Sequence, residues 1–449
     1  MPAHALRPLW GLLLLLACQP PAPTVDTPPN IVLIFADDLG YGDLSCYGNP
    51  VIHTPHLDRM AQEGVRLTSF CVAASVCTPS RAALLTGRYP IRHLPGNLGP
   101  ESMQGLPETE ITLANLLQDQ GYATMAIGKW HLGHATDALK PTGRGFDRFY
   151  GLMYSNDMIR PWVNTDSLLM LYENEVPVRE VGYEQANLTR AYTRQALDFI
   201  AENRNGPFFM YLPYAMPHLP VSAPEDAMQA AGGHRYRAVI QDIDAGVGAI
   251  LHQLDSLELD DNTLVVFTSD NGPWHNLPDR MLQRGNERWH TGSTGPLRGA
   301  KATTYEGGYR VPAILRWPGQ LPADRREGLM TSMDLFATLA HQAGALLPTD
   351  RPLDGRDMWS FLLGEGPARD TLFYVNHRRL EAVRIGNWKL RLDREEGPQL
   401  FHLDEDPGEM YNRYEREGET AAALRAAMEA FSAETDASIP VELFGEEGQ

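Results

Sequence analysis

The sequence contains few cysteines and has a deficit of positive charge. Four cysteines in 449 residues are too few for a disulfide-stabilised scaffold. Lysine and arginine together number 38 against 57 aspartates and glutamates, which gives a formal net charge of −19. A chain this acidic is not expected to bind nucleic acid, because phosphate contacts need a basic surface. The hydrophobic share of 43% and the charged share of 21% exclude a disordered, collagen-like or coiled-coil chain.

The sequence has one long apolar run, and it lies at the N-terminus. Leu9–Ala17 follows His4 and Arg7 and is too short to span a bilayer. It predicts a signal peptide over residues 1–17. The end of the run, Leu-Leu-Ala-Cys at residues 15–18, resembles a bacterial lipobox, which implies that Cys18 is lipidated and becomes the mature N-terminus. An ordinary signal peptide cleaved near the same place is the alternative.

Residues 18–29 are rich in proline and threonine and predict a tether ahead of the folded region. We therefore expect an exported bacterial protein in the periplasm or on the cell surface. Its expected contact with the membrane is the lipid on Cys18.

The region 30–350 predicts an α/β domain. Short runs that are apolar on both faces alternate with segments of helical spacing, which is typical of a mostly parallel sheet covered by helices. The expected strands are Ile31–Phe35, Ala123–Ile127, Phe208–Leu212, Leu264–Thr268 and Val311–Arg316. The expected helices include Ile111–Gln120, Leu188–Asn203 and Arg237–Leu257.

A different pattern begins after about residue 350. Short strand-like runs joined by tight turns predict a small antiparallel sheet, and a helical stretch follows over Glu419–Glu434. The expected strands are Thr371–Asn376, Ala382–Ile385, Trp388–Leu392 and Gln399–Leu403. Residues 351–449 are therefore expected to form a smaller C-terminal α+β unit.

Polar residues follow four of the predicted strands, where an open parallel sheet binds its ligands. Each alone is more typical of a turn, a cap or a solvated side chain, but together they indicate a site. They are Asp37, Asp38, Lys129, His131, His218, Asp270 and Asn271. The carboxylates and the amide suit Ca²⁺ or Mg²⁺ better than Zn²⁺. A bound cation would also relieve the repulsion among three clustered carboxylates.

The segment Cys77–Arg81, Cys-Thr-Pro-Ser-Arg, predicts the start of a helix. Thr78 is expected as its N-cap and Pro79 as its first helical residue. Cys77 would then lie at the helix N-terminus, which favours an anion. A buried structural thiol and a cysteine nucleophile of low pKa both fit this pattern, but neither explains a neighbouring metal cluster.

These residues carry a resemblance to the type I sulfatases. Cys77–Arg81 matches the family motif C-x-P-S-R, and the match continues through Leu85–Arg88. Gly128–Gly133, Gly-Lys-Trp-His-Leu-Gly, matches the second family signature. The chain is most similar to the branch of arylsulfatase A and N-acetylgalactosamine-6-sulfatase. The resemblance implies an alkaline-phosphatase-like α/β domain with a small C-terminal domain, in agreement with the strand and helix pattern.

The resemblance implies a mechanism in which a formylglycine-generating enzyme oxidises Cys77 to formylglycine (3-oxoalanine). One hydroxyl of the aldehyde hydrate attacks the sulfate sulfur, and the second lets the sulfated intermediate collapse and release sulfate. One Ca²⁺ ion would be held by Asp37, Asp38, Cys77, Asp270 and Asn271. Cys46 and Cys71 are then the cysteines left to pair, and the sequence does not say whether they do.

The same resemblance implies roles for the remaining site residues. Arg81 and Lys129 would stabilise the hydrate and the sulfate charge. His131 would act as the base for the collapse step, and His218 and Lys301 would bind sulfate and protonate the leaving oxygen. Ser155 aligns with a family serine near the hydrate. The loop Pro273–Pro296 either recognises substrate or packs on itself.

The expected substrate is an aryl sulfate or a sulfated carbohydrate of the N-acetylgalactosamine-6-sulfate type. Two alternatives stay open from the sequence. The first is a phosphonate or phosphodiester hydrolase of the alkaline phosphatase superfamily, because some phosphonate hydrolases also use formylglycine. The second is a glycan-binding lipoprotein without turnover, which would arise if Cys77 were never modified.

Overall fold

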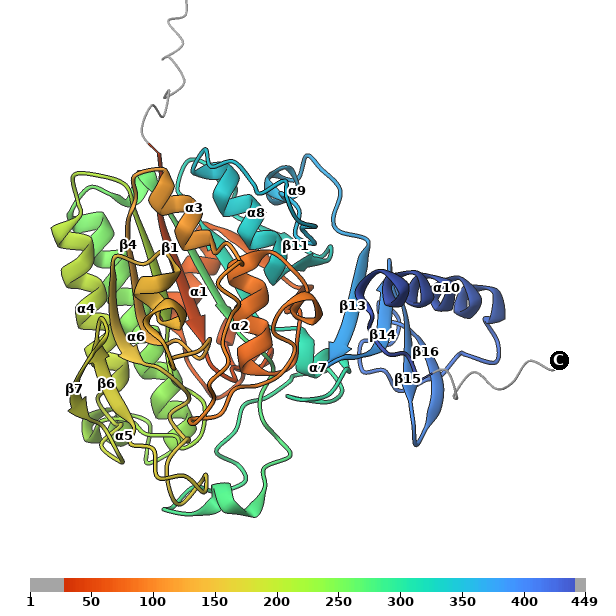
Figure 1. Ribbon diagram of the computed structural model, residues 1–449, viewed down its shortest axis with the longest axis horizontal. Coiled ribbons are helices and arrows are strands. Elements are labelled where there is room, and N and C mark those ends of the chain that lie inside the picture. The colour runs from red at the N-terminus through yellow and green to blue at the C-terminus, as the bar shows by residue number, and fades with distance from the viewer. Residues whose placement is uncertain (1–27, 441–449) are drawn as a thin grey trace, which may run out of the picture.

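The computed structural model describes residues 28–440, and most of its strands belong to one sheet (Figure 1). The strand order is β11-β2-β10-β9-β1-β8-β4-β5-β6-β7. These strands are β1 (Asn30–Ala36), β2 (Val65–Leu67), β4 (Ala123–Lys129), β5 (Arg148–Leu152), β6 (Met170–Glu173), β7 (Val176–Glu180), β8 (Phe208–Pro213), β9 (Thr263–Ser269), β10 (Ala313–Arg316) and β11 (Asp324–Arg326). A separate short pair joins β3 (Phe70–Cys71) and β12 (Met330–Thr331).

The centre of the main sheet is parallel and its two sides are antiparallel. Strands β9, β1, β8, β4 and β5 run parallel, and every residue of β1, β8 and β9 is buried. A strand covered on both faces needs apolar residues on both, which explains the continuous apolar runs in the sequence. Strand β10 runs antiparallel to β9 and β2, and β6 runs antiparallel to β5 and β7. The prediction of a mostly parallel sheet is confirmed.

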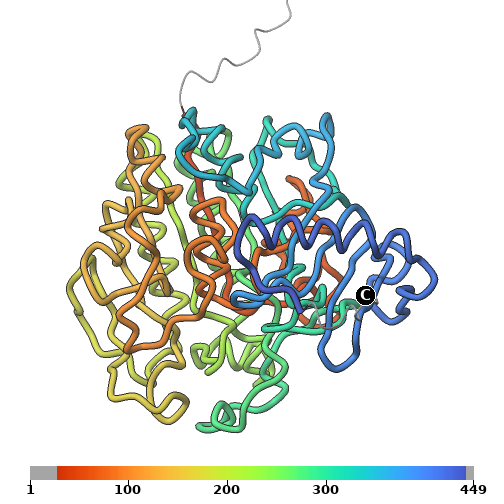
Figure 2. The backbone as a smooth tube through the Cα atoms, turned by 45° about the vertical axis from the view of Figure 1, so that its right-hand side comes forward, coloured from red at the N-terminus to blue at the C-terminus, as the bar shows by residue number. Residues whose placement is uncertain are grey.

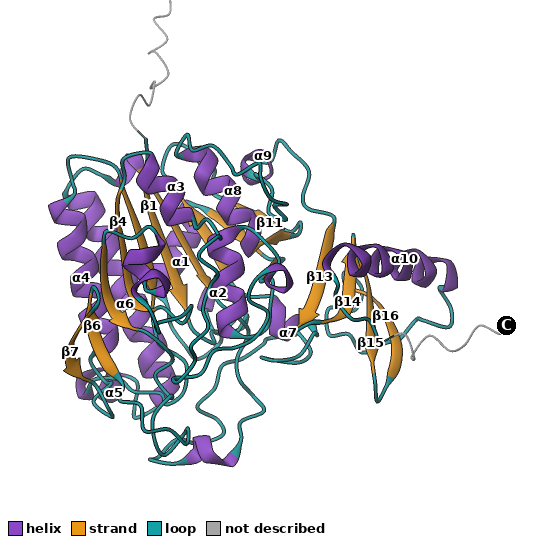
Figure 3. Cartoon of the chain, in the orientation of Figure 1, coloured by secondary structure: helices purple, strands orange, loops and turns teal. Residues whose placement is uncertain are grey.

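Helices cover the sheet in two layers (Figure 3). Helix α6 (Arg235–Ser256) packs with α1 (Pro55–Glu63), α4 (Leu188–Glu202) and α5 (Glu225–Ala230). Helix α8 (Ser332–Gln342) packs with α2 (Cys77–Thr86) and α3 (Leu113–Asp119). Two short helices, α7 (Glu306–Tyr309) and α9 (Trp359–Leu363), lie in connecting segments. The three predicted helices are confirmed, with ends shifted by one or two residues.

The C-terminal region forms the predicted small antiparallel sheet with one helix. Its strands are β13 (Thr371–Asn376), β14 (Arg379–Ile385), β15 (Trp388–Asp393) and β16 (Gly397–His402), and α10 (Gly418–Thr435) packs on β14 and β15. Figure 2 shows this unit against the side of the main body. Aromatic rings join the two: Phe431 stacks on Phe373 at 4.1 Å and meets Tyr89 edge-on at 5.0 Å.

Several sequence predictions concern cysteines and the N-terminus. Cys46 and Cys71 are both free in the structure, so they form no disulfide with each other. The predicted signal peptide, Cys18 and all but the last two residues of the predicted tether lie outside the described residues. Among the helices of residues 28–440, none has the length and apolar character needed to cross a membrane.

Candidate active site

The two pairs of polar residues predicted from the ends of β1 and β9 meet at the carboxyl edge of the sheet. Asp37 and Asp38 follow β1, and Asp270 and Asn271 follow its parallel neighbour β9. The backbone N–H of Asp38 donates to Asp270 Oδ1 at 3.0 Å, and Asn271 Nδ2 donates to Asp38 Oδ1 at 2.6 Å. All four side chains are buried. Parallel pairing of two apolar strands is what brings these polar groups together.

Each of the three carboxylates is paired with its own cation. Lys129 Nζ lies 2.6 Å from Asp37 Oδ2, and Lys301 Nζ lies 2.6 Å from Asp38 Oδ1. Arg81 donates to Asp270 Oδ2 from Nε at 3.1 Å and from Nη2 at 2.8 Å. These ion pairs offset the mutual repulsion of the carboxylates, so that repulsion does not by itself require a metal.

The charges in this cluster fix the ionisation of its members. Burial opposes the ionisation of Asp37, but Lys129, His218 and Arg81 together hold its pKa below the ordinary value. Burial likewise opposes the charged form of Lys301, yet Asp38 raises the pKa of Lys301 well above its ordinary value. The centre therefore holds full charges in a place that excludes bulk water.

The donor set fits a hard divalent cation. Oxygen or sulfur ligand atoms of Asp37, Asp38 and Cys77 and a ring nitrogen of His218 lie within 4.8 Å of one another. Asp38 Oδ2 and Asn271 Oδ1 are buried and accept no hydrogen bond from the described residues. Buried oxygens without donors are costly unless a cation takes them. Carboxylate and amide oxygens are the ligands that Ca²⁺ and Mg²⁺ prefer.

Cys77 lies at the N-terminus of α2, as the sequence predicted, but it is itself the first helical residue, two positions before the predicted Pro79, and it points into this cluster. Its Sγ lies 3.6 Å from Asp37 Oδ1 and 3.2 Å from Lys301 Nζ. Burial raises the pKa of the Cys77 thiol to about 12, although Lys129 and Lys301 act in the opposite direction. The unmodified thiol is therefore protonated at neutral pH, and the low-pKa nucleophile considered from the sequence is not what the structure shows.

The predicted N-cap Thr78 is wrong. Helix α2 begins at Cys77, Val76 occupies the cap position, and no side chain caps the helix. The Thr78 hydroxyl instead donates to the carbonyl of His131 at 3.1 Å and accepts from the backbone N–H of Leu98 at 3.2 Å. These tertiary hydrogen bonds replace the local cap and tie the start of α2 to the segment after β4.

His131 is buried with one ring nitrogen available. Its Nε2 lies 2.9 Å from the carbonyl oxygen of Leu98, which can only accept, so Nε2 carries the proton. Burial, followed by the charge of Lys129, holds the pKa of His131 well below its ordinary value, and the ring is neutral. Nδ1 is then a buried lone pair without a partner among the described residues. This geometry suits a proton acceptor.

His218 faces the cluster from the segment after β8. Its Nε2 lies 3.6 Å from Asp38 Oδ2, and its Nδ1 lies 2.6 Å from the carbonyl of Leu219. The carbonyl of His218 accepts from Asn156 Nδ2 at 3.4 Å, and Asn156 also donates to Gln185 Oε1 at 3.0 Å. Sequence reasoning missed both buried amides, because a loop Asn or Gln carries no pattern that marks it as support for a neighbouring histidine.

The comparisons with known proteins agree with this geometry. The model of the Sulfatase family matches residues 29–345. The chain belongs to the sulfatase family. Human arylsulfatase A is 39% identical over 438 residues, covering 86% of this chain and 84% of that protein. Dog N-acetylgalactosamine-6-sulfatase is 36% identical over 458 residues, covering 90% and 85%.

Solved structures give the same result. The crystal structure of Ps i-CgsB in complex with k-i-k-neocarrahexaose matches with a TM-score of 0.80 at 32% sequence identity, covering 90% of this chain and 93% of that one. Sulfatases are sulfuric ester hydrolases, so this chain is a hydrolase of that class, with the predicted alkaline-phosphatase-like fold.

Two further predicted site residues, Arg81 and Ser155, are both buried but differ in their hydrogen bonds. The guanidinium of Arg81 is taken up by Asp270, by the carbonyl of Lys129 at 2.9 Å and by Asp37 at 3.5 Å. Arg81 therefore holds the carboxylates of Asp37 and Asp270 in fixed positions. Ser155 is buried, and its Oγ has no hydrogen-bond partner among the described residues. Its neighbour Asn156 is the residue that reaches the backbone of His218.

The loop Pro273–Pro296 extends beyond the carboxyl edge of the sheet, at the bottom of Figure 1. Trp274 belongs to the site, since the Lys301 ammonium lies 5.0 Å from its ring centre and the His218 ring lies 5.7 Å away. Trp289 is 72% exposed and lies on the outer part of the loop. The start of the loop therefore contacts the charged centre, whereas Trp289 is exposed to solvent.

Asp43 fastens the far end of this loop to the segment after β1. It accepts from the backbone N–H of Ser293 at 2.7 Å and from Tyr236 Oη at 2.6 Å. Burial raises the pKa of Asp43 to about 7, even though its hydrogen bonds favour the charged form. The loop is therefore held at both ends.

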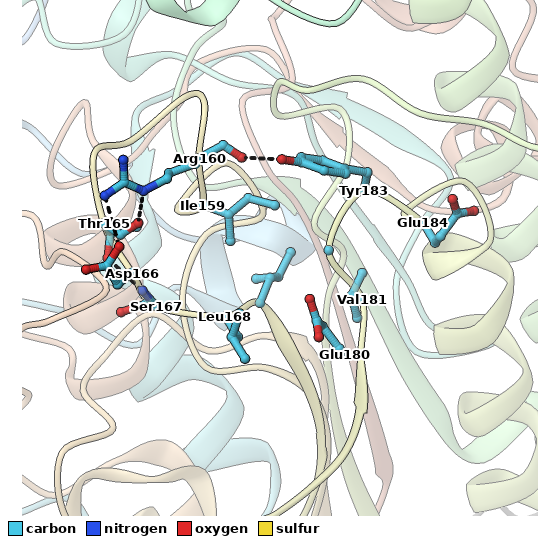
Figure 4. Close-up of a pocket in the computed structure, with 12 residues that line it drawn as sticks. Ile159, Arg160, Thr165, Asp166, Ser167, Leu168, Glu180, Val181, Tyr183 and Glu184 are labelled. Atoms are coloured by element: carbon cyan, nitrogen blue, oxygen red, sulfur yellow. Dashed lines mark hydrogen bonds and ion pairs between the residues drawn. The ribbon is translucent and has the colours of Figure 1, made fainter.

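A separate cavity of about 540 Å³ lies on the far side of Gln185, which binds the Asn156 that contacts His218 (Figure 4). Ile159, Leu168 and Val181 border it, and Tyr183 Oη donates to the carbonyl of Arg160 at 2.9 Å across one end. The cavity wall connects with the active edge through Gln185, which donates to the carbonyls of Gly182 and Asn156. The cavity is therefore next to, but not part of, the charged centre.

Proposed function

We propose that this sulfatase hydrolyses sulfate monoesters of aryl or carbohydrate alcohols through a formylglycine made from Cys77, with one calcium ion. The observation that carries the proposal is the position of Cys77, whose Sγ lies among Asp37, Lys301 and the unpartnered oxygen of Asp38. A protonated thiol is a poor nucleophile there, whereas an aldehyde hydrate at the same atom position would have charged partners on each side.

Asp37, Asp38, Asp270, Asn271 and the modified Cys77 would hold the calcium ion. When bound, the ion supplies positive charge for the ionised hydrate and for the sulfate oxygens. Lys129 favours the ionised form of Asp37, and Arg81 holds the Asp270 carboxylate in position for this purpose. Two buried oxygens that lack donors, on Asp38 and Asn271, favour this assignment.

We assign the two proton transfers of the reaction to different side chains of the site. His131 Nδ1 is an unpartnered lone pair and would accept the hydroxyl proton during release of sulfate. His218 Nε2 and Lys301 Nζ lie on the Asp38 side, where they would hold sulfate oxygens and protonate the leaving oxygen. Ser155 would contribute a hydroxyl close to the hydrate.

The substrate class is supported by the relatives. One is named for N-acetylgalactosamine-6-sulfate, and one solved structure is a complex with neocarrahexaose. Trp274, next to His218 and Lys301, offers a ring face on which a sugar could stack. We infer that a sulfated carbohydrate is the natural substrate and that small aryl sulfates report the same chemistry.

We also propose the maturation and location of the protein. A formylglycine-generating enzyme would act on Cys77 before folding buries it, since the thiol is 1% exposed in the folded chain. Residues 1–17 would direct export, and lipid on Cys18 would keep the enzyme in the periplasm or on the cell surface. Residues 30–350 would form the catalytic domain, with 351–449 as the C-terminal unit.

The first experiment is mass spectrometry of the tryptic peptide Leu67–Arg81 from protein made in its native host. We expect a carbonyl in place of the Cys77 thiol, with Cys71 in the same peptide unchanged as the internal control. Hydrolysis of an aryl sulfate should then exceed that of the matching aryl phosphate, and Cys77→Ala should abolish it. An intact thiol in folded, active enzyme would rule out the mechanism, and a preference for phosphate would favour the phosphonate or phosphodiester alternative.

A further inference from the structure

A second pocket, of about 560 Å³, is lined by four arginines although the whole chain carries a net charge of −19. It lies where the end of β2, the segment after β1 and the C-terminal sheet meet. Its lining includes Arg66, Arg310, Arg325, Arg384, Tyr41 and Tyr47. An acidic protein repels polyanions over most of its surface, so a concentration of arginines in one pocket selects where an anion can bind.

Two of these arginines have no carboxylate partner. Arg66 donates from Nη1 to the carbonyl of Cys46 and lies 5.7 Å from the ring centre of Tyr47. Arg310 donates from Nε to the carbonyl of Thr68 at 2.6 Å and lies 5.3 Å from the ring centre of Tyr41. Neither forms an ion pair within residues 28–440, so each guanidinium keeps N–H groups for another acceptor.

The other two arginines give the pocket a fixed inner wall and a charged rim. Arg384 is 4% exposed and donates to Ser69 Oγ at 3.0 Å, which orients that hydroxyl. Arg325 on the rim pairs with Glu327 at 2.6 Å. Arg384 also lies 3.8 Å from Glu306, so the positive charge that the pocket offers to a ligand is mainly that of Arg66 and Arg310.

The pocket and the catalytic centre lie at the same edge of the main sheet. Strand β10 separates β2 from β9, and Ala313 of β10 pairs with both Leu67 and Thr268. Residues 68–69 are therefore level with Asp270, two strand spacings or about 10 Å away across the sheet. Tyr41 follows the predicted metal ligand Asp38 by three residues. An extended molecule lying along this edge could contact both sites.

We propose that this arginine pocket binds a second sulfate group of a multiply sulfated carbohydrate, one that is not the ester being hydrolysed. Guanidinium groups bind tetrahedral oxyanions through paired N–H donors. The Tyr41 and Tyr47 rings, edge-to-face at 5.1 Å, provide an apolar surface for the attached sugar. The proposal relies on the proposed function only for the carbohydrate sulfate class; the pocket binds whether or not turnover occurs.

The test compares Arg66→Gln with Arg204→Gln, which removes the same charge from an exposed position outside the pocket. Binding of a dextran sulfate oligosaccharide is measured by calorimetry at low and physiological salt. We expect Arg66→Gln to weaken binding about tenfold or more, as loss of a charged hydrogen-bond donor requires, with Arg204→Gln close to wild type. Arg66→Lys, which keeps the charge but not the paired donors, should lie between.

Two further measurements make the result decisive. The kcat/KM for 4-nitrophenyl sulfate should be unchanged in Arg66→Gln, because a small monosulfate cannot reach the pocket from the active centre. Titration with inorganic sulfate separates the two sources of the anion. If Arg66→Gln weakens only the binding of inorganic sulfate, the carbohydrate assignment is overturned in favour of free sulfate.

The folded state of each variant is checked by its unfolding temperature, and Arg325→Gln on the exposed rim replaces Arg66→Gln should the latter not fold. Equal dextran sulfate binding by the wild type and the folded pocket variants would overturn the proposal. If the protein fails to hydrolyse 4-nitrophenyl sulfate yet shows binding that depends on Arg66, the proposed function fails and the pocket stands.

Discussion

Lysine is used sparingly in this chain, and almost every lysine has a buried partner. The four are Lys129, Lys140, Lys301 and Lys389. Lys129, Lys301 and Lys389 are buried in ion pairs, and Lys140 pairs with Asp137 near the surface. A buried ammonium is stable only when a carboxylate compensates its lost hydration. The three buried lysines are therefore held in position by their carboxylate partners, which are Asp37, Asp38 and Glu306.

Lys301→Ala should remove both charge stabilisation and a structural partner. We expect kcat/KM for an aryl sulfate to fall by about 100-fold or more, because a preorganised cation beside the reacting group is lost. In EDTA the free energy of unfolding should fall by about 3 kcal/mol, since Asp38 is left buried without its partner. Added calcium should recover part of this stability and none of the activity.

Lys140→Ala is the matched control for this variant, because it removes a lysine from a surface pair. It should change neither activity nor stability by more than about 1 kcal/mol. Equal activity of the two variants would show that Lys301 has no part in the reaction.

Individual residues also show how much of the site the sequence can predict. Asp37, Asp38, Asp270 and Asn271 could be predicted, because apolar runs mark the strands and their ends meet at one edge. Lys129 could be predicted in the same way, because it also stands at the end of an apolar strand, whereas the ion pairs that Arg81 and Lys301 form could not. Whether Lys301 in a glycine-rich turn is exposed or buried depends on tertiary packing. Thr78 likewise binds Leu98 and His131 instead of capping its helix.

Half-buried His93, whose ring nitrogen Nδ1 is buried, should make the protein sensitive to acid. Burial lowers the pKa of His93 to about 3, and the charge of Arg88 acts in the same direction. The unfolded chain protonates this histidine near pH 6.5 and the folded chain does not, so the unfolded state binds more protons below pH 6.5. Stability therefore falls as pH drops from 6.5 towards 3, by up to about 1.4 kcal/mol per pH unit from this group.

His93→Gln should remove that contribution. Thermal unfolding of the variant and of the wild type, followed from pH 7.5 to 4.5, should show a difference in Tm that shrinks or reverses as the pH falls. His234→Gln, at an exposed histidine, should follow the wild type throughout. Parallel curves for His93→Gln and wild type would mean that the ring is not held neutral.

Among the elements, the short helix α7 connects the two sheets through buried charges. Lys389 of β15 lies 3.0 Å from Glu306 of α7 and 2.9 Å from Glu409, and Glu409 also accepts from the backbone N–H of Glu306 at 2.7 Å. Residues of α7 then contact the active edge: the N–H of Gly272, next to Asn271, donates to the carbonyl of Gly308 at 3.1 Å. A Cβ on Gly272 would lie 1.8 Å from the carbonyl oxygen of Gly307, so this contact admits only glycine.

Lys389→Met should therefore act at a distance. Glu409 loses its cation and Glu306 is left with Arg384, 3.8 Å away, which should lower the free energy of unfolding by about 3–5 kcal/mol. As α7 shifts, Asn271 loses its alignment, and calcium affinity measured by titration should weaken along with aryl sulfate turnover. Arg379→Ala, which breaks the more exposed pair with Glu381 in the same small sheet, should cost about 1 kcal/mol or less.

If the Lys389→Met variant is destabilised and still binds calcium with wild-type affinity, then Lys389, Glu306 and Glu409 contribute only to folding. Unchanged stability would show that Lys389 is not needed to neutralise Glu306 and Glu409.

Elements differed in how well the sequence predicted them, for a physical reason. The central strands and the long helices carry strong periodic patterns because both are buried against neighbours. Strand β7 (Val176–Glu180) is exposed along its whole length, and β2 and β11 have three residues each. Such strands exist only through pairing with the edge of an existing sheet, which leaves no apolar pattern in the sequence.

For the whole molecule, the start of the folded chain and the candidate active site lie at opposite ends of the central strands. Strand β1 begins at Asn30 on one edge and ends beside Asp37 on the other, about 20 Å away. If residues 18–29 form the proposed tether, it would join the folded body at the end of β1 opposite the active site. A lipid on Cys18 would therefore hold the enzyme with its active edge directed away from the membrane, where a large sulfated glycan can reach it.

Cys18→Ala tests this arrangement in a bacterial host with a lipoprotein pathway. The wild type should sediment with membranes, whereas the variant should be exported and found in the soluble fraction. Because β1 starts at the end of the sheet opposite the active edge, kcat/KM for 4-nitrophenyl sulfate should be the same in both. Cys46→Ala, a cysteine of the folded body, should stay with the membranes. A soluble wild type would instead establish cleavage by an ordinary signal peptidase, and a membrane-bound Cys18→Ala would place the anchor elsewhere in the chain.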